Sequence, residues 1–119
     1  MEFIIHETDN GKVAELISDS VAVRNLQDGL DMIQKFLFSD TNKIIVRKEN
    51  IVPEFFDLNT RLAGNILQKF VNYHIKLAIV GDFKNITSEP LKAFVYESNR
   101  GNEIFFLEDV ETAIARLIK

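Results

Sequence analysis

Apolar residues recur along the chain with two different spacings, and the shorter spacing predicts strands. Phe3–Glu7 and Lys12–Ile17 are apolar, β-branched runs, and Asp9-Asn10-Gly11 between them is typical of a tight hairpin turn. The later strand-like runs are Lys43–Arg47, Lys76–Gly81 and Glu103–Leu107. Lys43–Arg47 is a short β-branched run with charged ends, as expected for a strand that is buried on both faces, and Lys76–Gly81 is predicted to be a second buried strand.

The longer spacing, with apolar residues three and four positions apart, predicts helices that bury one side. The four helical segments span about 26–39, 61–72, 88–101 and 109–119. The first should bury Leu26, Leu30, Ile33, Phe36 and Leu37. Thr87 or Ser88 is expected to cap the third helix and Asp109 the fourth. Gly101 suits a left-handed stop after the third.

Helices alternate with strands from residue 43 onward, which implies right-handed crossovers and a mostly parallel sheet. A chain of 119 residues has the usual size of one domain. We therefore expect a single α/β domain over residues 1–119, in which an N-terminal hairpin joins a mostly parallel sheet with four helices.

Charge and composition remove several classes of function. The net charge is −4 and the 14 Lys and Arg residues are scattered, which argues against nucleic-acid binding. The absence of cysteine excludes disulfides, thiolate nucleophiles and zinc–cysteine sites. We expect no targeting segment, and no apolar stretch approaches the roughly 18 residues of a membrane helix. We expect a cytosolic protein without a cofactor or metal, since His6 and His74 also lack neighbouring ligands.

Candidate ligand-binding residues follow two of the predicted strands. Ligands of open α/β sheets collect where the parallel strands end, and the polar residues of those loops include Glu54, Asp57, Asn59, Thr60, Asp82 and Lys84. Glu54, Asp82 and Lys84 form the candidate ligand pocket. Paired carboxylates can carry out acid–base chemistry or bind a hard cation if they converge. The three-residue spacing between Glu54 and Asp57 is more typical of acids in a solvated loop. No catalytic residue is therefore predicted.

The order of elements resembles that of STAS domains, the fold of sulfate transporters and anti-sigma-factor antagonists. Phe55-Phe56-Asp57 is similar to the apolar-apolar-Asp sequence before the central helix of that family. The sequence Asp109-Val110-Glu111-Thr112-Ala113-Ile114 is similar to the start of its last helix. The block from Glu54 to Gly101 more closely resembles a bacterial family catalogued as domain of unknown function 4180, a resemblance that implies no particular activity.

In STAS antagonists the aspartate is followed by Ser-Ser-Gly, and a serine at the head of the helix is phosphorylated. Here Asp57 is followed by Leu58-Asn59-Thr60-Arg61, so the serines and the glycine are missing. Thr60 could accept phosphate at a helix N-terminus. The competing interpretation is that Asn59 or Thr60 simply caps the helix.

The STAS resemblance implies that this loop and the following helix contact protein partners. The polar side of that helix, which includes Asn65 and Asn72, is rich in amides and poor in acids. We expect a non-enzymatic regulatory or protein-binding module whose partner surface comprises Asp57, Asn59, Thr60, Arg61, Gln68 and Lys69. One alternative is a small-molecule or lipid-binding domain, because the ten Phe residues could line a cavity. Another is a small enzyme that uses carboxylates at the strand ends. A homodimer is the preferred oligomeric state, although no residue fixes it.

Overall fold

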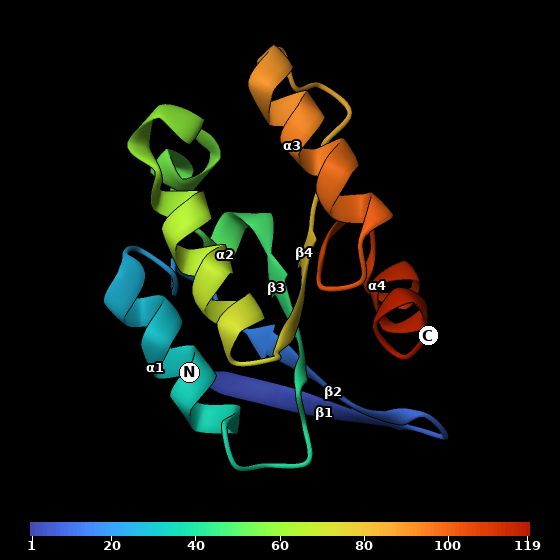
Figure 1. The fold of residues 1–119 in the computed structure, drawn as a ribbon. Coiled ribbons are helices and arrows are strands. Elements are labelled where there is room, and N and C mark those ends of the chain that lie inside the picture. The colour runs from blue at the N-terminus through green and yellow to red at the C-terminus, as the bar shows by residue number, and fades with distance from the viewer.

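The computed structural model describes residues 1–119, and a single five-stranded sheet forms its centre (Figure 1). The strands are β1 (Glu2–Thr8), β2 (Gly11–Ile17), β3 (Lys43–Arg47), β4 (Lys76–Val80) and β5 (Ile104–Leu107). They lie side by side in chain order. β1 pairs with β2 antiparallel and every other pair is parallel. The predicted α/β class and the hairpin joined to a mostly parallel sheet are confirmed.

Four helices cover the two faces of the sheet. They are α1 (Leu26–Phe36), α2 (Leu62–Asn72), α3 (Glu89–Arg100) and α4 (Val110–Leu117). Side chains from α1, α2 and α3 share one apolar cluster with Ile44 and Leu77, whereas α4 packs with Ile45 and Ala78 on the opposite face. This packing places three helices on one face and α4 on the other, and Figure 1 shows α1 and α2 on the side of the sheet opposite α4. Each helix is too short and too polar to traverse a lipid bilayer.

Three single turns of 3₁₀ helix connect β3 to α2. They are η1 (Lys48–Asn50), η2 (Pro53–Phe56) and η3 (Leu58–Thr60). Phe55 from η2 is buried in the cluster beneath α2, so this connection is packed onto the domain. A loop built in this way holds a defined shape at the edge of the sheet.

Several predicted helix caps are confirmed. Ser88 Oγ accepts a hydrogen bond from the Leu91 amide at 3.3 Å, and Asp109 Oδ1 accepts one from Thr112 at 2.7 Å. Each bond satisfies one of the amides that have no partner within the first turn of a helix.

The structure corrects three local predictions. Gly101 follows α3 with a φ of −86°, so the predicted left-handed stop is wrong. The hairpin turn consists of Asp9 and Asn10 alone, because Thr8 pairs with Gly11, and Gly11 takes the positive φ of 127° after the turn. α1 buries Gly29 and Met32 in addition to Ile33 and Phe36, whereas the predicted Leu26, Leu30 and Leu37 are half-buried.

The buried stripe of α1 is rotated because this helix packs on α2 as well as on the sheet. A Cβ atom built on Gly29 would lie 3.1 Å from Ile66 Cγ2 of α2. This close approach turns the Gly29 side of α1 inward. Periodicity alone gives the apolar side of a helix but not the second helix that it meets.

α2 ends in a motif that usually requires glycine. The Ile75 amide donates to Phe70 O at 2.9 Å and the His74 amide donates to Val71 O at 3.0 Å, which is the hydrogen-bond pattern of a Schellman stop. His74 occupies the left-handed position with a φ of 58°. Its side chain is exposed and makes no hydrogen bond that would compensate the backbone strain.

We expect His74→Gly to raise the free energy of unfolding by about 0.5–1 kcal/mol, because glycine adopts a positive φ without the steric cost of a Cβ atom. Chemical denaturation measures the change. The control is His74→Ala, which retains the Cβ atom and should give no gain. Equal stability of the two variants would contradict the strain at this position.

Candidate functional site

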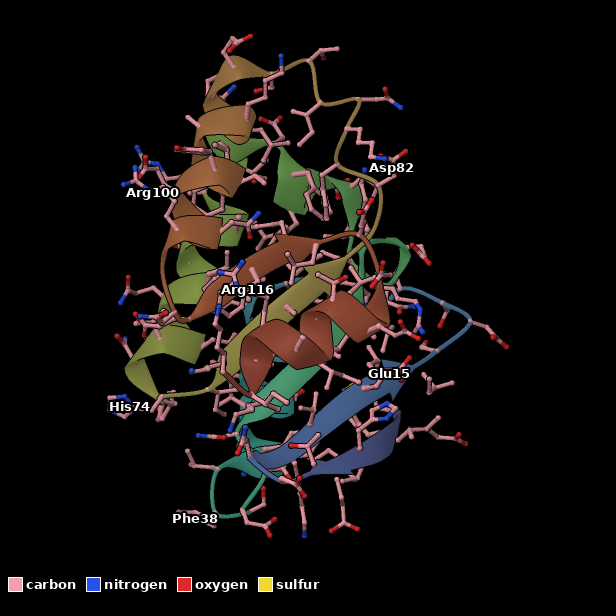
Figure 2. All side chains as sticks on the ribbon, turned by 90° about the vertical axis from the view of Figure 1, so that its right-hand side faces the viewer. Glu15, Phe38, His74, Asp82, Arg100 and Arg116 are labelled. Carbon is pink, nitrogen blue, oxygen red and sulfur yellow. The ribbon has the colours of Figure 1, made fainter.

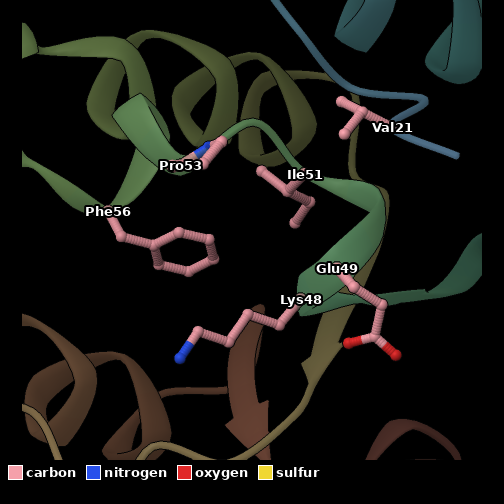
Figure 3. Close-up of a pocket in the computed structure, with 6 residues that line it drawn as sticks. All are labelled: Val21, Lys48, Glu49, Ile51, Pro53 and Phe56. Carbon is pink, nitrogen blue, oxygen red and sulfur yellow. The ribbon is translucent and has the colours of Figure 1, made fainter.

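The segment that follows the carboxyl end of β3 borders a pocket of about 440 Å³, which we call the strand-end pocket. It is lined by Val21, Lys48, Glu49, Ile51, Pro53 and Phe56 (Figure 3). Most of these residues come from η1, η2 and the short link between them. The pocket lies at the edge of the sheet where ligands of open α/β folds collect.

A buried asparagine fixes one wall of this pocket. Asn50 is 1% exposed, and its Nδ2 donates to the carbonyl oxygens of Ser18 and Ser20 at 3.0 Å each. Its own backbone oxygen accepts from the Val23 amide at 3.0 Å, and Val23 O accepts from Val52 at 2.9 Å. The segment after β2 is thereby attached to η1, which places Val21 beside Ile51 (Figure 3).

Lys48 lies at the base of the pocket between two aromatic rings. Its Nζ is 5.8 Å from the ring centroid of Phe56 and 5.3 Å from that of Phe83, within the range of cation–π attraction. The same Nζ donates to Asp82 O at 3.1 Å. The ammonium therefore links the loop after β3 to the loop after β4.

The close approach of Lys48 to β4 depends on a glycine. A Cβ atom on Gly81 would lie 2.7 Å from Lys48 Cβ, which is too short for a non-bonded contact. Gly81 therefore allows η1 to approach the end of β4.

The predicted regulatory loop is internally hydrogen-bonded. Asp57 Oδ1 accepts from the Asn59 amide at 3.1 Å. Thr60 Oγ1 lies 2.9 Å from Glu54 O and 2.8 Å from Asp57 O, and it accepts from the Leu62 amide at 3.2 Å. The Thr60 hydroxyl thus accepts a hydrogen bond from the first residue of α2, but the N-cap position is Arg61, which makes no side-chain cap bond, so the prediction that Asn59 or Thr60 caps this helix is wrong.

Arg61 precedes α2 in the left-handed conformation, with a φ of 63°. Its side chain is exposed, as are those of Asn59 and Gln68, whereas Lys69 is half-buried. Gln68 Nε2 donates to Asn72 Oδ1 at 2.9 Å along the outer side of α2. The predicted partner surface is thus mostly accessible, with Lys69 at its border.

The structure separates the residues of the predicted ligand pocket. Glu54 is exposed and lines neither the strand-end pocket nor the neighbouring pocket at Asp82. Asp82 Oδ1 accepts from the Lys84 amide at 2.9 Å, which makes a local turn. Lys84 instead pairs with Glu108 at 3.6 Å, between two largely exposed side chains. No three Asp, Glu, His or Cys side chains are grouped so that they could hold a metal ion.

Sequence reasoning missed a buried ionic cluster on the α4 side of the sheet. Glu15 on β2 is 6% exposed, and its Oε1 lies 2.7 Å from His6 Nε2 on β1. Arg47 on β3 donates to Glu15 Oε2 and, at 3.1 Å, to Leu16 O. Figure 2 shows Glu15 on the sheet beside α4. The available signal was an acid within the apolar run Val13-Ala14-Glu15-Leu16.

The partners of Glu15 decide its charge. Burial alone would raise the pKa of this carboxyl, but the hydrogen bonds from His6 and Arg47 and their charges outweigh burial and lower the pKa. Glu15 is therefore ionised at neutral pH and forms an ion pair with Arg47 between β2 and β3, while His6 of β1 is hydrogen-bonded to its other carboxylate oxygen.

Comparison with known proteins gives one match. The family described as Domain of unknown function (DUF4180) matches residues 8–117. No curated protein and no solved structure matches the chain. The predicted likeness to domain of unknown function 4180 is confirmed, whereas the likeness to STAS domains stays a prediction.

We expect Glu15→Gln to lower the free energy of unfolding at pH 7 by about 2 kcal/mol, because Arg47 loses its buried carboxylate partner. The folded pKa of Glu15 is the depressed one. Its contribution is thus complete above the unfolded value of about 4.3 and is lost as the pH falls through the folded pKa. Denaturation between about pH 3 and 7 should show the gap between wild type and variant closing on acidification.

Glu7→Gln is the matched control for this measurement, because Glu7 is exposed on the same hairpin and forms no ion pair. It should change stability little at any pH. A gap for Glu15→Gln that stays constant down to pH 3 would contradict the proposed coupling.

We expect Gly81→Ala to lower the free energy of unfolding by about 1–3 kcal/mol, since the new methyl group would collide with Lys48 Cβ. Lys48→Gly removes that atom, so Gly81→Ala should cost less in a Lys48→Gly background than in the wild type. Gly64→Ala is the control: no atom lies within 4 Å of a Cβ built on Gly64 of α2. This variant should gain about 0.5–1 kcal/mol from helix propensity. Thermal or chemical unfolding measures all three, and an unaffected Gly81→Ala would contradict the close approach.

Proposed function

The chain belongs to the DUF4180 family, which matches residues 8–117, and we propose that it is a non-enzymatic, cytosolic binding module that regulates a protein partner. The contact surface in this proposal is the strand-end pocket, the loop from Asp57 to Arg61 and the exposed side of α2. The observation that carries the proposal is an open pocket with apolar walls beside a loop that its own hydrogen bonds hold in one shape.

A preformed loop favours recognition because little conformational entropy is lost on binding. The hydroxyl of Thr60 and the carboxylate of Asp57 fix the path of the loop, and exposed Asn59 and Arg61 are presented at its surface. Arg61 also holds a strained backbone conformation. Strain of this kind is often retained at binding sites, where the surrounding structure maintains it.

The chemistry of the surface is that of a protein contact. Ile51, Pro53 and Phe56 offer an apolar centre, and Lys48 and Glu49 place polar groups beside it. Protein interfaces commonly have an apolar core within a polar rim. We infer that the partner inserts an apolar side chain into the strand-end pocket.

A small ligand in the same pocket is the second candidate. The Lys48 ammonium beside apolar walls favours a ligand with an apolar body and one anionic group. A ligand enclosed within the core has less support, because the space between the sheet and α1 and α2 measures about 10 Å³. Phe55 and Phe70 fill that region.

The hydrogen bonds of the carboxylates at the strand ends support the non-enzymatic part of the proposal. Asp57 and Asp82 each accept a hydrogen bond from an amide two residues further along the chain. These acids therefore shape turns, and Glu54 does not line the pocket that Asp82 lines. Such local roles account for the acids that an enzymatic alternative would use.

The test places a photo-crosslinking amino acid at Asn59 in the host cell. We expect a covalent adduct of one defined mass, and none from the same probe at Glu111, which is exposed on α4 across the sheet. Val21→Glu should abolish the adduct by placing a charge at the pocket, while Val21, at 38% exposed, tolerates the change in the fold. Mass spectrometry measures the adduct.

Thr60 supplies a matched pair for the same assay. Thr60→Val removes the hydroxyl that holds the loop and should reduce the adduct about fivefold or more, whereas Thr60→Ser retains the hydrogen bonds and should preserve it. No adduct at Asn59, or equal adducts from Asn59 and Glu111, would overturn the proposed surface.

A further inference from the structure

A second polar pocket lies at the opposite edge of the sheet, where β4 and β5 begin, and we call it the basic pocket. Its volume is about 370 Å³. Four cations line it, Lys76, Arg100, Arg116 and Lys119, and no acid does. The whole chain has 18 acidic residues and only 14 Lys and Arg. This concentration of positive charge therefore opposes the overall charge of the chain.

Arg116 is held in place before any ligand arrives. Its guanidinium carbon lies 4.5 Å from the ring centroid of Phe105, which is 2% exposed, and an N–H group donates to Asn99 O at 2.7 Å. Figure 2 shows Arg116 on α4 and Arg100 at the end of α3. The N–H groups of Arg116 not used by Asn99 remain available to the pocket.

Most of these cations have no carboxylate partner. Lys76, Arg116 and Lys119 take part in none of the seven ion pairs of the chain. Arg100 approaches Glu97 at 3.9 Å, between two side chains that are about two-thirds exposed. Like charges in one pocket repel each other, and a bound anion would relieve this repulsion.

Compensation of helix dipoles explains only part of the cluster. α3 and α4 both end here, and a cation in the last turn of a helix is favourable, which accounts for Arg100 and Arg116. Lys76 begins β4 and belongs to no helix, and Lys119 follows the end of α4. The positive charge therefore exceeds what the two helix ends require.

We propose that the basic pocket binds a phosphate-bearing small molecule with at least two negative charges. The planar guanidinium of Arg116 suits phosphate oxygens, and Lys76 and Lys119 supply further charge-assisted hydrogen bonds. The pocket volume leaves room for an organic group beside the phosphate. The site is separate from the strand-end pocket and does not depend on the proposed protein contact.

The test is a titration of the ¹⁵N-labelled chain with inorganic pyrophosphate at low ionic strength, followed by NMR. We expect saturable shifts at the Gly101 and Asn102 amides and at Arg116 Nε, with affinity that falls as salt is added. Lys76→Gln and Lys119→Gln should each weaken binding about five- to tenfold. Lys35→Gln, which removes an equal charge at the end of α1, should change it less than about twofold.

Arg116→Gln is a less suitable test variant, because it also removes the contact between Arg116 and Phe105 that supports the fold. The two lysine variants test the pocket without that loss. Absence of saturable shifts at the pocket, shifts at every exposed cation, or an equal loss in Lys35→Gln would overturn the proposal. Tighter binding of a single-stranded oligonucleotide, with shifts that extend beyond the pocket, would also overturn it and would assign the cations to a nucleic acid.

Discussion

Strands β3 and β4 are buried on both faces, and the arrangement of the helices follows from this constraint. Ile44, Ile45 and Val46 of β3 are at most 1% exposed, and β4 is buried from Leu77 to Val80. Apolar side chains that alternate above and below a strand must be covered on both sides. α4 supplies the second cover, although it has only eight residues.

The short length of α4 explains why an ionic cluster lies in the sheet. α4 contacts β3, β4 and β5, and no helix covers the outer face of the β1–β2 hairpin. Ile4 is consequently 50% exposed there. His6, Glu15 and Arg47 lie at the boundary between the covered and the open part of this face. The aliphatic parts and paired charges of such side chains tolerate partial contact with water better than further apolar residues would.

Local sequence patterns were sufficient to predict the helices and strands. Most features that the sequence did not predict depend on contacts between residues far apart in the chain. The bounds of β3 and the caps at Ser88 and Asp109 were predictable, because each depends on neighbours along the chain. The Glu15–Arg47 pair joins residues 32 positions apart and depends on the register of β2 against β3. For the same reason the strand-end loops could be predicted from the sequence, but the pocket could not. Val21 lines the pocket only because the buried side chain of Asn50 holds the segment around Val21 by hydrogen bonds.

The topology also places a cation from every helix at the same edge of the sheet. Strands β2 to β5 are parallel to one another, and each is followed by a helix that runs back along the sheet. All four helices therefore end at the edge where β3, β4 and β5 begin. Each has a cation in its last turn, namely Lys35, Lys69, Arg100 and Arg116. In a chain with a net charge of −4, these four cations lie at one edge of the sheet, where each compensates the negative end of a helix dipole. Lys76 and Lys119 increase that charge at one place only, between the ends of α3 and α4, so the basic pocket departs from the pattern that the fold itself imposes.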